Sequence, residues 1–500
     1  MTVRTKTKWF TSFMLASVLS FNPIAMCLAE TSDSVEQNPN LADADGQKLA
    51  ARVESVDPDS ALNKVEDLNR QILEKEIELG RFNLHYKQNV GKVGRWTGWR
   101  YAAFQEANFA LNMSGAINNL GEQYAHIHDP ERNSNNRLGM GNVIGMIGSI
   151  IGTSGAILEF SINEYNAVKA ARKGFSTRAA RKHVLDLKEQ INSLLSERDD
   201  LVKIEQSAPL LTARTEVDVV EGKILKDIRD LDLLEFSRFH IGQRRYIAFQ
   251  QALYAFDMAK FSTSAVASAF AFLALHKHDG KWNEKTGILW NISGGLIVAA
   301  PVASRVFGAT VGKLHSHLIS PISRNVETRE LATLEADDAA LDKLIKEGSA
   351  PAGSTRGAIQ RAVVYNAEAK GFHDELHQAL QARRKANLVA TQNIASGFFV
   401  GGTTIARGVL YDVAGSRFSS NSPRSTLESN SYTFAGDILG TVGSATALVD
   451  TLRLQVKGEV ERHKLEKRGQ LPSQLLDARL KQLDEMEALL KHETKPSPKN

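Results

Sequence analysis

The sequence is poor in cysteine, in proline and in net charge. Its one cysteine, Cys27, excludes an intramolecular disulfide and any metal site built from several thiolates. Twelve prolines in 500 residues leave long stretches without helix-breaking residues, which favours long helices. A formal net charge of +4 is nearly balanced, so no nucleic-acid partner is expected. With 42% hydrophobic and 24% charged residues, the chain has the composition of a folded protein.

Sustained alternation of polar and apolar residues, the pattern that predicts β-strands, is also missing. Apolar residues recur instead at spacings of three, four and seven, as in the stripe of Val65, Leu68, Ile72, Leu79 and Phe82. That spacing places them on one face of an amphipathic helix. The predicted fold class is therefore all-α.

The first 29 residues have the pattern of a signal peptide. The basic stretch MTVRTKTKWF precedes the apolar FMLASVLSFNPIAM, and Cys27 and Ala29 supply small residues at a cleavage site. This pattern predicts cleavage after Ala29 and export to the periplasm or cell envelope. Lipidation of Cys27 and an uncleaved anchor are the alternatives. The polar, acidic residues 30–59 predict a disordered linker, and residues 494–500 a disordered tail.

Several landmarks recur along the chain at offsets of about 145 residues. RYAAFQEA (100–107) returns as RYIAFQQA (245–252), and GNVIGMIG (141–148) returns as GDILGTVG (436–443). Three leucine pairs follow the same register: Leu187 and Leu194, Leu334 and Leu341, Leu476 and Leu483. These landmarks predict three tandem helical repeat units, 60–206, 207–348 and 349–493. Each unit is expected to be an apolar Gly/Ala-rich helical hairpin flanked by long charged amphipathic, coiled-coil-like helices.

The apolar hairpins allow two interpretations. Residues 138–158 and 286–304 carry no charge over about 20 positions, which is long enough to cross a bilayer. Asn142, Asn291 and Asp437 weaken this interpretation, because they occupy the same repeat position and a carboxylate is costly in lipid. A soluble or peripherally bound bundle, with the hairpins buried in protein, is the favoured prediction, and stable membrane insertion is the alternative.

Basic residues cluster where the first hairpin meets its charged arm: Lys169, Arg172, Lys173, Arg178, Arg181 and Lys182. This collar favours contact with an anionic membrane surface, although an ordinary solvated helix face explains it as well. If the chain is exported, the collar lies on the translocated side, opposite to the positive-inside rule. The predicted export and an inserted hairpin are therefore in conflict.

One polar group of residues suggests a divalent metal site. His126, His128 and Asp129 lie in the first hairpin loop, and His276, His278 and Asp279 in the second. Imidazole and carboxylate are good ligands for first-row metals, so two adjacent loops would be able to share an ion. Helix termination explains the same residues, because histidine suits a helix C-terminus and the dipeptides DP and DG form turns. No other cofactor is expected.

No catalytic constellation is recognisable in the sequence. GATVGK (308–313) is one residue short of a phosphate loop, and its flanks do not predict the required strand. We therefore expect an exported, non-enzymatic protein that acts as an envelope-associated structural or interaction module. Its heptad helices would serve a protein partner or self-association. The alternative is an integral membrane protein that is channel-like, pore-forming or membrane-remodelling, and metal binding comes third.

Overall fold

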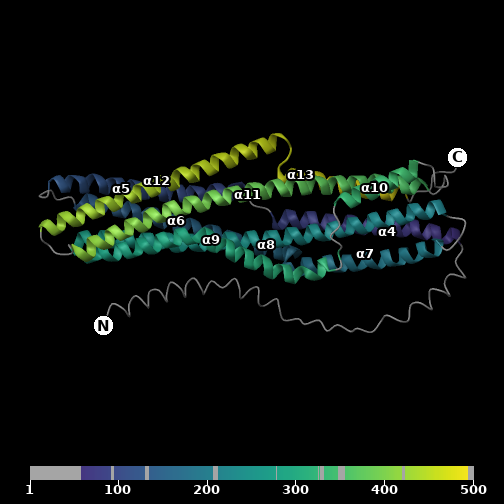
Figure 1. The fold of residues 1–500 in the computed structure, drawn as a ribbon, viewed down its shortest axis with the longest axis horizontal. Helices are drawn as coiled ribbons and strands as arrows, with labels where there is room; N and C mark the ends of the chain where they lie inside the picture. The colour runs from purple at the N-terminus through teal and green to yellow at the C-terminus, as the bar shows by residue number, and fades with distance from the viewer. Residues whose placement is uncertain are drawn as a thin grey trace, which may run out of the picture.

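The computed structural model is an elongated bundle of helices (Figure 1). It describes residues 58–91, 95–129, 135–206, 212–277, 279–324, 326, 331–346, 355–418 and 423–493. Every element within these ranges is a helix, so the predicted all-α fold class is confirmed. The predicted signal peptide, nearly all of the acidic linker and the C-terminal tail lie outside the described residues.

The helices follow one another along the chain with short connections. They are α4 (Pro58–Val90), α5 (Arg95–His128), α6 (Asn135–Ala170), the π-helix η1 (Ala171–Phe175), α7 (Thr177–Gln206), α8 (Thr212–Lys277), α9 (Lys281–Ser323), α10 (Leu331–Lys346), α11 (Thr355–Arg417), α12 (Pro423–Lys467) and α13 (Pro472–Glu493). The kink within η1, between α6 and α7, depends on Gly174, whose φ of 86° suits glycine.

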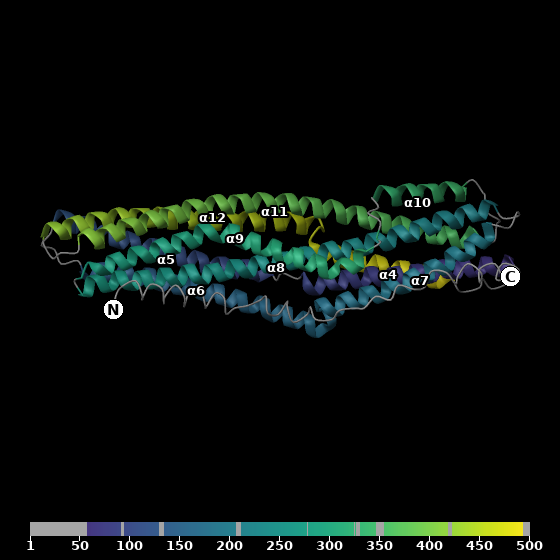
Figure 2. The same ribbon diagram turned by 60° about the horizontal axis from the view of Figure 1, so that its bottom comes forward.

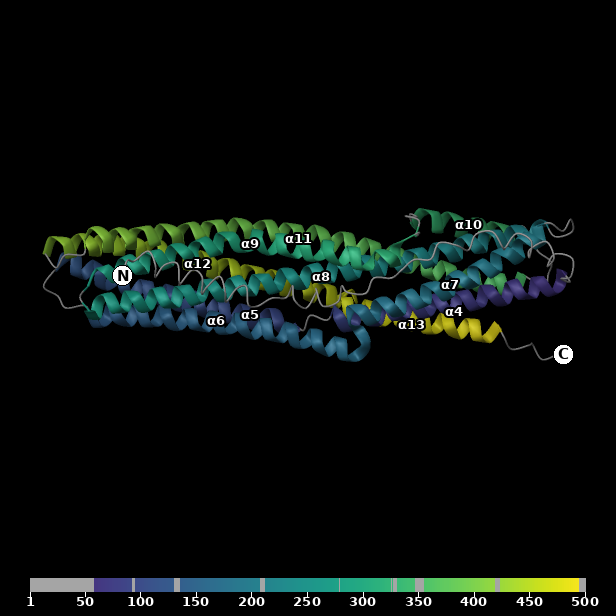
Figure 3. The same cartoon turned by 90° about the horizontal axis from the view of Figure 1, so that it is seen from below.

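The bundle has two halves along its length. Helices α5, α6 and α12 lie in one half and α4, α7, α10 and α13 in the other, whereas α8 and α11 run through both (Figures 1 and 3). Helix α8 has 66 residues, which corresponds to about 99 Å. Both halves are therefore joined by uninterrupted helix.

The first half is a closed ring of six helices. Neighbours contact one another in the order α5, α6, α8, α9, α11, α12, and α12 contacts α5 to close the circle. Figure 2 shows these helices running side by side. We call this half the ring; it comprises α5, α6, α12, the C-terminal parts of α8 and α11, and α9 up to about residue 314. Helices α5, α8 and α11 each end at the outer end of the ring, which we call the tip (Figure 1).

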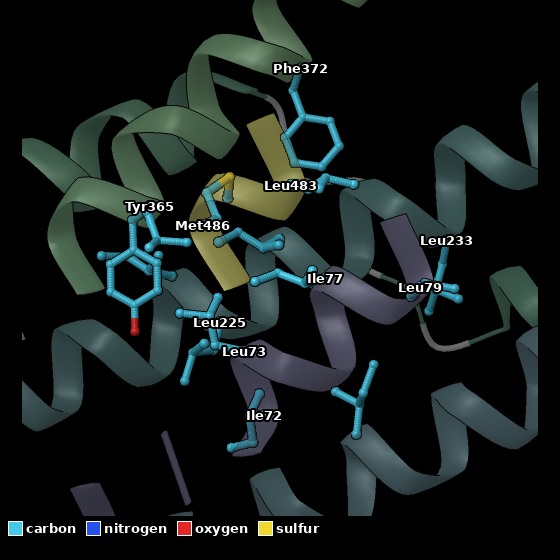
Figure 4. Close-up of a cluster of buried hydrophobic side chains, with 14 of the residues drawn as sticks. Ile72, Leu73, Ile77, Leu79, Leu225, Leu233, Tyr365, Phe372, Leu483 and Met486 are labelled. Atoms are coloured by element: carbon cyan, nitrogen blue, oxygen red, sulfur yellow. The ribbon is translucent and has the colours of Figure 1, made fainter. Parts of the chain in front are cut away.

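The second half, which we call the stalk, contains α4, α7, α10, α13, the N-terminal parts of α8 and α11 and the end of α9. Its centre is one apolar cluster in which Ile72, Leu225, Tyr365 and Leu483 meet from four helices (Figure 4). The amphipathic stripe of α4 predicted from the sequence faces this cluster, with Val65, Ile72 and Leu79 fully buried. The stalk is thus held together by ordinary burial of large apolar side chains.

In some parts of the chain a charged arm and its apolar helix form one continuous helix, and in one part they are separate helices. The sequence predicts two separate helices in each unit, yet α8 and α11 each contain both parts without a break. Only the first pair is divided, with α4 ending at Val90 and α5 beginning at Arg95. The reason is local: GKVG (91–94) contains two glycines, which weaken a helix, whereas HIGQRRY (240–246) contains one glycine and no proline.

Glycines allow the ring helices to approach each other closely. A Cβ on Gly141 of α6 would lie 2.7 Å from the carbonyl oxygen of Gly115 on α5. Gly294 and Gly401 meet in the same way between α9 and α11, each 2.9 Å from the other's carbonyl oxygen when given a Cβ. Side chains at these positions would separate the helices, so glycine is required for the observed spacing.

Candidate functional site: the polar interior of the ring

A cavity of about 430 Å³ lies inside the ring and is bordered by residues of all six ring helices. Its lining extends along α5 from Gly98 to Asn112 and along α12 from Gln455 to Gly440. Gly98 is exposed and Gln455 is half-exposed, so the end nearest the stalk meets solvent. Asn112 and Gly440 lie about halfway to the tip. The cavity therefore occupies the stalk-side half of the ring.

Asp257 on α8 forms the charged part of the cavity wall and is 2% exposed. It accepts hydrogen bonds from the hydroxyl of Tyr101 and from Gln105 Nε2, which is 3.2 Å away, both on α5. The ammonium of Lys260, one turn further along α8, lies 2.6 Å from its carboxylate. The buried acid is therefore paired with a cation and with two further donors, as burial of a charge requires.

A second charged network crosses the ring at the inner end of the cavity. Asp437 on α12 is fully buried and accepts hydrogen bonds from Arg407 and, at 2.9 Å, from the hydroxyl of Tyr411, both on α11. Gln123 on α5 donates to its other oxygen at 3.0 Å. The guanidinium of Arg407 also lies 4.2 Å from the ring centroid of Trp290 on α9. This network links four of the six ring helices.

Residue spacing on α12 explains why its polar groups point inward. Ser425, Ser429, Thr433 and Asp437 are each four positions apart and all are buried, so they share one helix face. The opposite face carries exposed apolar residues: Ile438, Val442, Val449, Leu452 and Val456. Helix α12 is thus amphipathic with its apolar side turned outward.

A pair of buried histidines lies where the ring meets the stalk. The Tyr86 hydroxyl is 2.6 Å from His240 Nδ1, and the ring centroids of His240 and His315 are 5.5 Å apart. Burial, together with the nearby Arg244, lowers the pKa of His240 to about 3 and the pKa of His315 to about 4. Burial also raises the pKa of Tyr86 to about 12. Both imidazoles are therefore neutral near pH 7.

Three buried acids come together in the stalk, namely Glu76 on α4, Asp232 on α8 and Glu368 on α11. Glu76 is 2% exposed, and neither of its carboxylate oxygens has a hydrogen-bond partner. Burial, with the neighbouring Asp232 and Glu368, raises its pKa well above the ordinary value. Burial likewise raises the pKa values of Asp232 and of Glu368, even though Glu368 pairs with Arg479. Such an arrangement favours protonated carboxyls.

The residues predicted to bind metal lie at the tip. His128 and Asp129 are exposed at the end of α5, and His276 is exposed at the end of α8, stacked on Phe272. His126 is half-buried, His128 Nδ1 is 2.9 Å from the Tyr124 carbonyl oxygen, and Asp279 accepts from the backbone N–H of Lys281 at 3.1 Å.

No group of three or more histidine, cysteine, aspartate or glutamate side chains is placed to hold a metal within the described ranges. His278, a member of the predicted set, lies outside those ranges. The contacts of the described members suit helix termination, and the metal site stays a prediction.

Asp257, Lys260 and Arg407 were not recognised from the sequence as parts of a site. The available signal was weak: Asp257 and Lys260 are the only charged residues between positions 246 and 275, and Arg407 follows an uncharged stretch from 386 to 406. In the sequence, Asp437 is interpreted only as a charge that would be unfavourable in lipid. Its partners Gln123 on α5 and Arg407 on α11 are 314 and 30 positions away, so spacing alone does not reveal them.

The chain has no significant match among protein-family models, curated proteins or solved structures.

Proposed function

We propose that this chain is a non-enzymatic membrane protein whose ring inserts into a lipid bilayer and whose stalk projects from it as an interaction module. One observation carries the proposal: the ring is apolar outside and polar inside. Of the exposed large hydrophobic residues, all but Ile359, Val363 and Leu489 lie on ring helices within the described ranges. A surface of this kind suits hydrocarbon, whereas its polar interior is shielded by neighbouring helices.

The dimensions of the apolar surface support the proposal. Trp99 and Tyr124 are both exposed and lie 25 positions apart on α5, which is about 37 Å along a helix. Tyr165 and Tyr246 are exposed near the stalk end as well. Tryptophan and tyrosine concentrate at the two interfaces of a membrane whose hydrocarbon core is about 30 Å thick.

Helix composition supports insertion for part of the ring. Three of the described helical stretches, those that include α6, α8 and α9, contain windows long and apolar enough to cross a membrane. Only 28–39% of the residues in these windows are buried in the protein. Helices α5, α11 and α12 carry more polar residues, but Asn108, Arg407 and Asp437 face the ring interior and are shielded from lipid.

We further propose that the three helix sets α4–α7, α8–α10 and α11–α13 are tandem repeats of one hairpin unit. Each set contributes two neighbouring helices to the ring. The leucines aligned by the sequence register meet in the same stalk cluster, where Leu187 and Leu334 are buried and Leu476 packs against them as a partly buried residue. A threefold repeat accounts for a ring of three hairpins on a stalk of their arms.

The side of the membrane on which the stalk lies depends on whether the N-terminal segment is a cleaved signal peptide. The basic residues Arg172, Lys173, Arg178 and Lys182 lie in η1 and α7, at the stalk side of the ring. The positive-inside rule then favours a cytoplasmic stalk, whereas cleavage of a signal peptide would favour an exported one. We retain export to the envelope as the proposal, with the collar held against anionic headgroups. A protein partner or a second copy would bind the stalk, and metal binding at the tip is a separate proposal.

A peripheral bundle is the second candidate, and one observation favours it: α5, α11 and α12 are not among the helices apolar enough to span a membrane by composition. Membrane extraction separates the two candidates. Membranes from cells that produce the full chain are treated with high salt, with carbonate and then with detergent. Insertion predicts release by detergent alone, and release by salt or carbonate would contradict it.

A further inference from the structure

The cavity extends deep into the part of the ring that the proposed function places in lipid. Along α5 its lining runs from Gly98 to Asn112, which is about 21 Å of helix. This is roughly two thirds of the thickness of a hydrocarbon core. Its solvent-facing end is on the stalk side, so only the tip-side part of the ring separates its inner end from the opposite surface.

A polar track continues beyond the inner end of the cavity. Gln123 on α5 and Thr433 on α12 are buried on the tip side of Asp437, and Gln123 Nε2 lies 3.4 Å from the Thr433 hydroxyl. Ser429, one turn nearer the tip on α12, is also buried. Hydrogen-bonding groups therefore follow the ring interior on both sides of the charged network.

Tight contacts between α11 and α12 block the polar track at the level of the Arg407–Asp437 pair. A Cβ on Gly440 would lie 2.8 Å from Arg407 Nη1, and one on Gly436 would lie 3.0 Å from the Tyr411 ring. These two glycines give α12 the room to hold both side chains of α11 inside the ring. The Arg407–Asp437 pair thus fills the interior where the cavity ends.

The electrostatics of the pair suit a barrier. A lone buried charge would attract ions of opposite sign and repel those of the same sign, whereas the pair presents neither charge to an approaching ion. Tyr411 and Gln123 also donate to Asp437, so each of its carboxylate oxygens is already hydrogen-bonded within the ring.

We propose that the ring encloses a pathway for small inorganic ions, of which the cavity is the water-filled half and the Arg407–Asp437 pair is the closed barrier. This inference rests on the proposed membrane insertion. The pair then sets both closure and charge selectivity. Loss of Arg407 leaves an unpaired carboxylate that favours cations, and loss of Asp437 leaves a guanidinium that favours anions.

Ion flux through reconstituted full-length protein tests the barrier. Arg407→Gln, Asp437→Asn and the double variant are compared with wild type in phosphatidylcholine vesicles loaded with potassium- or chloride-sensitive dye. Arg424→Gln, at a side chain 89% exposed at the tip, is the matched control. We expect at least tenfold faster potassium flux for Arg407→Gln, at least tenfold faster chloride flux for Asp437→Asn, and wild-type rates for the control. Wild-type rates in both single variants, each shown to be folded by circular dichroism, would overturn the proposal.

Thiol accessibility tests the water-filled half with milder substitutions. In a Cys27→Ser background, single cysteines replace Ser444 in the cavity, Ser429 beyond the pair and Ile150 on the outer surface of α6. A charged, membrane-impermeant thiol reagent is added to vesicles whose stalk faces the medium, as judged by trypsin cleavage. We expect Ser444→Cys to react and the other two not to react.

The outcomes separate the two proposals. An unreactive Ser444→Cys, or a Ser429→Cys that reacts equally fast from the stalk side, overturns the ion pathway while insertion stands. A reactive Ile150→Cys, together with release of the protein from vesicles by carbonate, overturns insertion and the pathway with it.

Discussion

Helix α9 passes through both halves of the molecule, and its two ends bury opposite kinds of residue. In the ring it buries Thr286, Gly287 and Ser293, while Ile288 and Ile292 are exposed. In the stalk it buries Ile319 and Ile322 in the apolar cluster. The same contrast holds for the two halves as wholes: the apolar cluster of the ring consists of Ala267, Leu289 and Trp290, with Val266 and Phe270 beside them.

Under the proposed insertion, this difference means that α9 meets lipid at one end and water at the other. In the stalk, large apolar side chains leave water, and their burial stabilises the bundle by roughly 25 cal/mol per Å². In the ring, glycines allow backbone contact and buried ion pairs link the helices, so little large apolar surface is removed from its surroundings. Substitutions of the same kind should therefore have different effects in the two halves.

The largest expected effect lies in the stalk, at its buried ion pair. Arg361 on α11 is 1% exposed and donates to Glu221 on α8 through Nε at 2.9 Å and through Nη2 at 3.1 Å. Arg361→Met leaves the Glu221 charge buried without this partner and should lower the free energy of unfolding by about 3–5 kcal/mol. Denaturant titration followed by circular dichroism measures the loss. Glu221→Leu with Arg361→Met should recover most of it, and a double variant as unstable as the single one would contradict this account.

A charge on the outer surface tests the ring against the stalk directly. Ile150 on α6 is 50% exposed and Val363 on α11 is 55% exposed. Ile150→Lys should cost about 2.5–3.5 kcal/mol of insertion free energy if lipid covers this surface. Val363→Lys, on a surface that meets water, should change little. The carbonate-resistant fraction of each variant measures the effect, and equal fractions would remove the proposed difference between the halves.

Two glycines on one helix test the close contacts of the ring. A Cβ on Gly287 would lie 2.5 Å from the Gly408 carbonyl oxygen, whereas one on Gly295 meets nothing within 4 Å. Gly287→Ala should lower the free energy of unfolding by about 1–3 kcal/mol, because α9 and α11 must separate. Gly295→Ala should raise it by up to about 1 kcal/mol through helix propensity. Thermal unfolding in detergent compares them, and a neutral Gly287→Ala would contradict the close packing.

The smallest effect is a dependence of stalk stability on pH. The pKa of His240 is about 3 in the folded protein and lies near 6.5 in an unfolded chain. Because the unfolded state binds the proton first, acidification below pH 6.5 destabilises the fold, by about 1.4 kcal/mol at pH 5.5 for this histidine.

His240→Asn keeps an acceptor for Tyr86 and removes this titration. Its loss of stability between pH 8 and pH 5.5 should therefore be smaller than in the wild type by that amount. His373→Asn, at a side chain 61% exposed, is the control and should behave as wild type. Identical pH profiles for wild type and His240→Asn would contradict the assigned pKa. Denaturant titrations at the two pH values measure the free energy of unfolding of the wild type and of each variant.

The sequence allowed prediction of the parts that depend on local pattern. The absence of strand alternation predicted the all-α class, and the stripe of Val65, Ile72 and Leu79 predicted the buried face of α4. The separate charged and apolar helices predicted for every unit are found only in the first, where α4 and α5 are divided, and not in α8 or α11. The ring interior depends on long-range contacts, however, since Asp437 meets partners on α5 and α11. From the sequence alone, the charge of Asp437 is therefore expected to oppose membrane insertion, although the ring shields it.

Closure of the ring has a consequence for the time course of synthesis. The last ring helix, α12, contacts the first, α5, and in the stalk Arg81 pairs with Asp484, 403 positions later in the chain. At ribosomal rates of 5–20 residues per second, roughly 20–70 s pass between completion of α5 and of α12. During this interval Asn108 and Gln123 lack the wall that later covers them. We therefore expect the nascent chain to depend on a chaperone or an insertase until its third hairpin arrives.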